Sequence, residues 1–98
     1  MTRDDALRLL AQHKAQLTEE FGVTALYLYG SVARNEAGPE SDVDVLAEFD
    51  GRPMGYFKFF DLQERLSRIL GMQVDLATPD SLHRRIRDAV IREAIRAA

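Results

Sequence analysis

The sequence predicts a small α/β domain in which helices and strands alternate in the order α-β-α-β-α-β-α. Two short runs, 23–29 and 43–49, are rich in β-branched, aromatic and other apolar residues, which is typical of strands. Two longer segments, 3–20 and 55–70, carry apolar residues at helical spacing. The length of 98 residues fits one domain that spans residues 1–98.

The two long helices have capping residues at their ends. Thr2 can cap the first helix, with Asp5 three residues further on, and Gly22 is placed to end it. Gly71 is placed in the same way after the second long helix. The first helix is therefore expected to begin and end close to Thr2 and Gly22, and the second to end close to Gly71.

Shorter elements fill the rest of the chain. A glycine-serine pair breaks the first strand, and a short helix is expected over 31–36. A third strand is expected over 73–77, and Thr78-Pro79 opens the last helix, with proline near its first position. The apolar residues of this last helix include Leu82, Ile86, Val90 and Ala94.

The lengths of the connections predict how the strands pair. The link between the first and second strands is short, which favours antiparallel pairing. The link between the second and third strands is long and helical, which permits a parallel crossover. We therefore expect a small mixed β-sheet that is covered by helices.

Composition argues against several kinds of site. The chain has no cysteine, which excludes disulfides and thiolate metal sites and favours an intracellular, cytoplasmic protein. The two histidines, His13 and His83, lie far apart in the sequence, which argues against a zinc site. A net charge of −3 argues against direct nucleic-acid binding, and no stretch approaches the ~18 apolar residues of a membrane span.

Asp42 and Asp44 form an acidic pair at the start of the second strand. Side chains two residues apart on a strand point to the same face, so their backbone positions lie roughly 6–7 Å apart on that face. Two neighbouring carboxylates repel each other unless a cation lies between them. Hard oxygen ligands suit Mg²⁺, especially with substrate phosphates, although a bare Asp-x-Asp is also typical of exposed acids at a strand edge.

Gly30 and Ser31 lie between a strand and a helix. Such a turn offers free backbone N–H groups to a phosphate, and glycine lets the phosphate approach the backbone closely. Ser31 adds a hydroxyl donor, although the pair can also be a simple turn with a serine cap. Arg34 follows closely, where it can reach a triphosphate or pair with an acid that fixes the loop.

The spacing of these two motifs is more informative than either alone. Ten residues separate Ser31 from Asp42, which is enough for a short helix and turn to bring both motifs to one end of the sheet. Asp75 adds a third acid on an apolar strand, where an unpaired charge costs free energy unless a cation is bound. Three carboxylates and a phosphate turn indicate metal-assisted phosphoryl or nucleotidyl transfer, in which Asp75 binds metal or acts as a base.

The segment from Gly30 to Asp44 resembles the signature of polymerase-β-like nucleotidyltransferases, in which ten residues separate Gly-Ser from Asp-x-Asp. It is most similar to the minimal nucleotidyltransferase (MNT) antitoxins that are paired with HEPN toxins. The segments 62–66 and 74–76 also fit this family, so the resemblance covers nearly the whole chain.

The resemblance implies a role for each candidate residue. Gly30 and Ser31 would hold the β- and γ-phosphates of ATP, and Asp42 and Asp44 would bind Mg²⁺, with Asp75 completing the triad. Family members transfer AMP from ATP to a tyrosine of the partner toxin and so silence its RNase activity. The intact triad implies an active relative.

The length of the chain bears on the acceptor. We expect no room for a separate substrate domain in 98 residues, so the acceptor hydroxyl would come from a partner protein in a hetero-oligomer. Two alternatives stay open: an antitoxin that neutralises its partner by steric binding, with a vestigial site, and a nucleotide sensor that binds ATP without transfer.

Two surfaces are weaker candidates for partner contact. Four aromatic residues within five positions cannot all face one way on a helix, so one or two can be exposed: Tyr56, Phe57, Phe59 and Phe60. The arginine-rich segment from His83 to Arg96 is typical of a solvated helix face, but it can also meet an acidic partner or toxin-held RNA.

Overall fold

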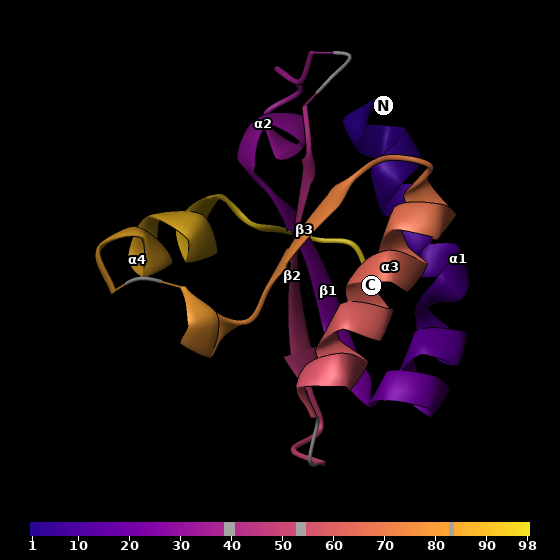
Figure 1. The fold of residues 1–98 in the computed structure, drawn as a ribbon. Helices are drawn as coiled ribbons and strands as arrows, with labels where there is room; N and C mark the ends of the chain where they lie inside the picture. Colours follow the sequence, from indigo (N-terminus) through magenta and orange to yellow (C-terminus); the bar gives the residue numbers. More distant parts are fainter. Residues whose placement is uncertain (39–40, 53–54, 83) are drawn as a thin grey trace.

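Within the residues that the computed structural model describes, 1–38, 41–52, 55–82 and 84–98, four strands form one mixed sheet in the order β3-β2-β1-β4 (Figure 1). The strands are β1 (Val23–Tyr29), β2 (Val43–Phe49), β3 (Val74–Ala77) and β4 (Ile95–Arg96). Strand β1 is antiparallel to β2 and β4, and β2 is parallel to β3. The predicted α/β fold with a mixed sheet, including both strand pairings, is confirmed.

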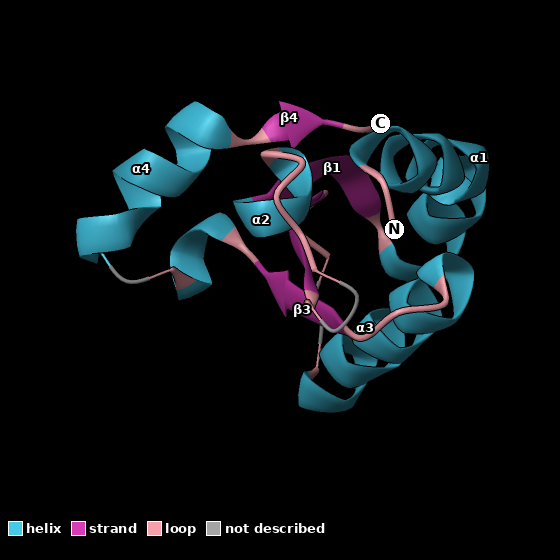
Figure 2. Cartoon of the chain, turned by 90° about the horizontal axis from the view of Figure 1, so that it is seen from above, coloured by secondary structure: helices cyan, strands magenta, loops and turns pink. Residues whose placement is uncertain are grey.

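The hydrophobic core lies between one face of this sheet and two long helices, α1 (Arg3–Phe21) and α3 (Tyr56–Leu70) (Figures 1 and 2). Leu28, Val45 and Leu76 are paired across the three neighbouring strands, and all three are buried in this core. Because successive residues of a strand point to opposite faces, the residues on either side of this row point away from the core.

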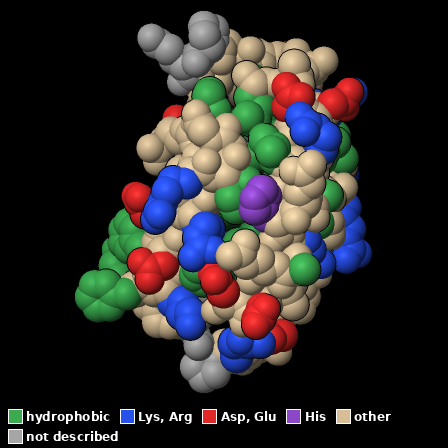
Figure 3. Space-filling view, turned by 90° about the vertical axis from the view of Figure 1, so that its right-hand side faces the viewer, with side chains coloured by type: hydrophobic (Ala, Val, Ile, Leu, Met, Phe, Trp, Pro, Cys, Tyr) green, Lys and Arg blue, Asp and Glu red, His purple; other side chains and the backbone are tan. Residues whose placement is uncertain are grey.

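Helix α4 (Arg84–Glu93) lies on the other side of the sheet from α1 and α3 (Figure 1). The short helix α2 (Gly30–Ala33) follows β1 and contacts β1, β2 and α4. The side of the molecule that α1 and α3 cover carries interspersed acidic and basic side chains (Figure 3), in keeping with the small net charge. No helix in the described part of the chain is long and apolar enough to cross a membrane.

The ends of the long helices agree with their capping residues. The backbone N–H of Asp5 donates to the Thr2 hydroxyl at 3.1 Å, which caps α1. Gly22 ends α1 in the left-handed conformation, and its N–H donates to the Thr18 carbonyl at 2.9 Å. These predicted limits are confirmed to within a residue.

The short helix is shorter than the predicted range of 31–36. The N–H of Arg34 still donates to the Gly30 carbonyl at 3.1 Å, but Asn35 has a φ of 60°. A positive φ cannot continue a right-handed helix, so α2 ends at Ala33.

The start of the last helix was predicted wrongly. Thr78 and Ser81 form a capping box around a 3₁₀ turn, η1 (Pro79–Ser81), and α4 begins only at Arg84. The Thr78-Pro79 signal therefore caps a separate short element, because each cap satisfies only the orphan N–H groups of its own turn.

Strand β4 is absent from the prediction, which continued the last helix through Ala94. Ile95 and Arg96 instead pair with β1, and the N–H of Ala97 donates to the Leu26 carbonyl at 2.8 Å. A two-residue strand is too short to show a periodic pattern. It forms because the free edge of β1 offers unpaired backbone groups.

Candidate functional site

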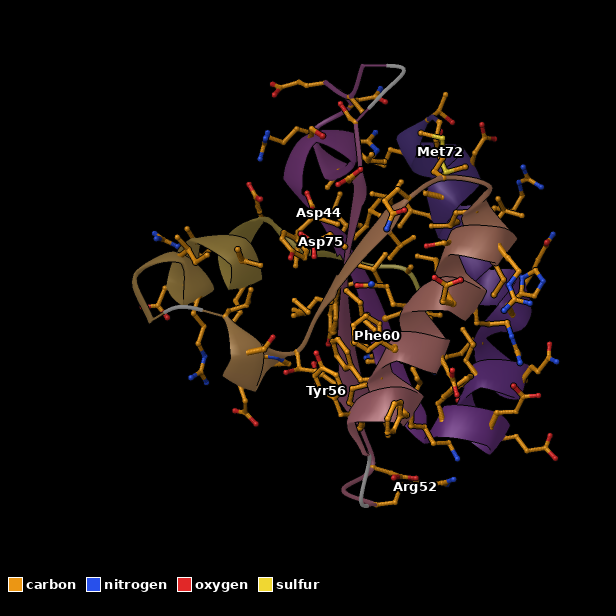
Figure 4. All side chains as sticks on the ribbon, viewed as in Figure 1. Asp44, Arg52, Tyr56, Phe60, Met72 and Asp75 are labelled. Carbon is orange, nitrogen blue, oxygen red and sulfur yellow. The ribbon has the colours of Figure 1, made fainter. Side chains whose placement is uncertain are left out.

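Tyr29, Asp44 and Asp75 form one row across three neighbouring strands. Tyr29 is paired with Asp44 on β2, and Asp44 is paired with Asp75 on β3. Paired residues of a sheet point to the same face, and neighbouring strands lie about 4.8 Å apart. The row lies next to the buried row that includes Leu28, so it points away from the core formed with α1 and α3. Figure 4 shows Asp44 and Asp75 side by side near α2.

The row lies in a negatively charged environment. Partial burial raises the pKa of Asp44, and the charges of Asp75 and Asp42 raise it further. Burial also raises the pKa of Tyr29 to about 12, with added effects from Asp44, Asp75 and Glu93. Because like charges disfavour ionisation, a cation placed beside these groups would be favoured electrostatically.

Gly30 brings the glycine-serine turn against the acidic strand. It has a φ of 73°, and a Cβ at this position would overlap Oδ2 of Asp44. Glycine is therefore required both for the left-handed backbone and for the close approach of the carboxylate. The two motifs meet at one end of the sheet, as their ten-residue spacing predicts.

Asp42 lies just before β2, where its side chain is exposed and its charge acts on Asp44. In the part of the chain that the structure describes, no group of three His, Cys, Asp or Glu side chains has a geometry that holds a metal ion. The three aspartates therefore do not form a ready-made ligand cage. The donor set still fits Mg²⁺, because this ion is usually held by one or two carboxylates, with phosphate and water oxygens completing its shell.

Ser31 and Arg34 lie on and directly after α2. Ser31 follows Gly30 and is partly exposed. The Nε of Arg34 donates to Glu36 at 3.1 Å, so the loop-fixing ion pair, one of the two roles left open for Arg34, is present. Hydrogen bonds to Glu36 and then to Glu93 raise the pKa of Arg34, which keeps the guanidinium charged beside the turn.

Sequence reasoning gave no role in this site to Tyr29 or Glu93. Glu93 ends α4, and its Oε1 accepts a hydrogen bond from the Gly30 N–H at 3.1 Å, although the two residues are 63 positions apart. The Nη1 of Arg34 also donates to Glu93, at 3.1 Å from Oε2. The position of Tyr29 directly before Gly30 could have identified it as part of the site. Glu93 had no such signal, because it is an isolated acid in an arginine-rich segment.

Comparison with known families identifies the domain that carries this arrangement. The family model of the nucleotidyltransferase domain matches residues 10–97. The chain belongs to the nucleotidyltransferase family. In this nucleotidyltransferase, the matched range includes the glycine-serine turn and all three aspartates, and the resemblance noted in the sequence is confirmed at the level of the family.

Relatives of this nucleotidyltransferase include a protein adenylyltransferase, MntA of Thermococcus cleftensis, which is 39% identical over 97% of this chain and 95% of its own length. A solved structure described as a candidate minimal nucleotidyltransferase is 33% identical, with a TM-score of 0.78 over 97% of this chain and 95% of that chain. A second solved structure, tri-AMPylated Shewanella oneidensis HEPN toxin with MNT antitoxin, contains a 17% identical chain with a TM-score of 0.65. That match covers 94% of this chain and 71% of that one, and it shows a shared fold alone.

Proposed function

We propose that this nucleotidyltransferase transfers AMP from ATP to a hydroxyl of a partner HEPN toxin, in a reaction that depends on Mg²⁺, and thereby acts as an antitoxin. The observation that carries the proposal is the contact between Gly30 and Asp44, because it brings a phosphate-binding turn against an acidic strand. The relationship to MntA of Thermococcus cleftensis supports adenylyl transfer.

The residues divide into two groups by their chemistry. The Gly30 N–H, the Ser31 hydroxyl and the Arg34 guanidinium would bind the triphosphate, since all three groups are able to donate hydrogen bonds to anionic oxygens. Asp42, Asp44 and Asp75 would hold Mg²⁺. When bound, Mg²⁺ would supply positive charge that offsets the charge of the phosphates.

In the transfer step, the acceptor oxygen would attack the α-phosphorus of ATP. The bond from this phosphorus to the bridging oxygen of the β-phosphate breaks, and pyrophosphate leaves. The hydroxyl proton would pass to a carboxylate, for which Asp75 is well placed. Asp75 is exposed and lies on β3, at the edge of the sheet, so a partner's side chain can approach it.

A tyrosine of the toxin is the proposed acceptor, and the AMPylated HEPN toxin in a complex of the same fold supports a protein acceptor. Three aromatic side chains on α3 offer this partner a contact surface. Tyr56, Phe57 and Phe60 are 74%, 83% and 46% exposed. Exposed aromatic groups are frequent anchors of protein interfaces.

Steric neutralisation is the second candidate function. The exposed aromatic surface favours it, because Tyr56 and Phe60 lie away from Asp44 and Asp75 (Figure 4) and can bind a partner without any chemistry at the aspartates. In this function the toxin is blocked by contact, and ATP is not required.

Intact mass spectrometry of the toxin separates the two functions. The toxin is incubated with this chain, ATP and Mg²⁺, and then weighed. Transfer predicts added AMP units that disappear with Asp44→Asn. An unchanged mass, together with full inhibition of the toxin by the Asp42→Asn/Asp44→Asn protein, would establish steric neutralisation instead.

A further inference from the structure

The carboxylate of Glu93 binds the same two groups that are proposed to bind phosphate. Its Oε1 accepts the Gly30 N–H at 3.1 Å, and its oxygens lie 3.1 and 3.3 Å from Nη1 of Arg34. A carboxylate and a phosphate are both anions that accept hydrogen bonds from backbone N–H groups and guanidinium groups. Glu93 therefore mimics a phosphate oxygen pair at this position.

We infer that Glu93 competes with the triphosphate for Gly30 and Arg34, so that nucleotide binding requires the Glu93 side chain to leave. This inference rests on the proposed function, because it concerns the same triphosphate site. A protein whose binding-competent state is only partly populated binds its ligand more weakly by that fraction. Glu93 thus sets the apparent affinity of the site for ATP.

The charge of Glu93 opposes nucleotide binding as well. The side chain adds a fourth carboxylate to the region of Asp42, Asp44 and Asp75, and its charge acts on Asp44 and on Tyr29. An incoming triphosphate brings several more negative charges to the same place. Movement of Glu93 away from Gly30 would remove one repulsive charge and free two hydrogen-bond donors together.

The packing of α4 allows this movement. Of the α4 side chains that the structure describes, only Val90 is buried, while Ile86 and Ile91 are 52% and 49% exposed. The Glu93 side chain itself is 34% exposed. A helix end with few buried contacts opens at a low free-energy cost. The following strand, β4, is separately hydrogen-bonded to β1, so Glu93 can swing away without loss of the sheet.

A positioning role is the opposite interpretation of the same contacts. If Glu93 only holds Arg34 in place for the nucleotide, its removal weakens ATP binding. If Glu93 competes, its removal strengthens ATP binding. The sign of the change in affinity therefore distinguishes the two roles.

The test is isothermal titration calorimetry of ATP with Mg²⁺ on the full chain and on Glu93→Gln, which keeps the size of the side chain but removes its charge. We expect the dissociation constant to fall by about 2- to 5-fold, the range for a partly exposed ion pair. Glu36→Gln is the matched control, because Glu36 also pairs with Arg34 but does not contact Gly30. It should change the affinity by less than about twofold.

If the wild-type chain binds ATP and Glu93→Gln binds it equally or more weakly, Glu93 does not compete with the triphosphate. The proposed function would still stand. If neither the wild-type chain nor the Glu93→Gln chain binds ATP, this result would contradict the proposed function itself. The amide resonance of Gly30 gives a second readout by NMR. Competition predicts that ATP and Glu93→Gln both shift this resonance, whereas Glu36→Gln leaves it in place.

Discussion

Asp44 lies directly against the Cα of Gly30, so close that any side chain on Gly30 would overlap the Asp44 carboxylate. The two residues belong to different motifs, the glycine-serine turn and the acidic strand. Their contact joins these motifs into one site at the end of the sheet. The stability of the fold and the shape of the site should therefore both depend on the absence of a Cβ at position 30.

Gly30→Ala should lower the free energy of unfolding by about 2–4 kcal/mol, because it combines a strained positive φ with a steric overlap. Gly51→Ala is the matched control, since Gly51 has a φ of 89° but an added Cβ there would meet no atom within 4 Å. This control should cost about 1 kcal/mol from backbone strain alone. Urea denaturation measures both values, and equal losses would contradict the contact.

Asp44→Asn should make the chain more stable at pH 7, because it removes a charge from a partly buried and negative environment. The pKa of Asp44 is raised in the folded state, so its ionised form opposes folding and its protonated form does not. The gain in melting temperature, about 2 °C at pH 7, should shrink as pH falls through the raised pKa towards the ordinary aspartate value of 3.8. A gain that stays constant with pH, measured by thermal unfolding, would show that charge is not the cause.

Phe57→Asp should weaken the proposed complex with a toxin partner by about tenfold or more, because it places a charge in an aromatic contact surface. Phe57 is the most exposed of these side chains, at 83%, so the substitution should leave the fold intact. Ile86→Asp is the matched control, as Ile86 is 52% exposed on α4, on the other side of the sheet. Surface plasmon resonance with the toxin measures both, and comparable losses would argue against the aromatic surface.

Local chemistry explains which parts of the fold could be predicted. Strands β1 and β2 are rich in apolar and β-branched residues, and α1 has a threonine cap and a terminal glycine, so each element is encoded within its own segment. The meeting of Gly30 with Asp44 was also predictable, because the short link restricts where β2 can begin.

Long-range contacts explain the rest. Strand β4 exists only because the edge of β1 is open to it, and its two residues carry no pattern of their own. The hydrogen bond from Gly30 to Glu93 depends on the position of α4 in the fold, and no local sequence pattern specifies this position. The roles in metal and nucleotide binding stay predictions, because they depend on a ligand as well as on the fold. This holds for Asp42, Asp44, Asp75, Gly30, Ser31 and Arg34.

The most direct test of adenylyl transfer follows two differently labelled forms of ATP. The toxin is incubated with this chain and Mg²⁺, using ATP labelled with radioactive phosphorus at either the α- or the γ-phosphate. Adenylyl transfer predicts that label from the α-phosphate enters the toxin and that label from the γ-phosphate does not, with no transfer by Asp44→Asn. Label from the γ-phosphate in the toxin, or none from either form, would contradict it.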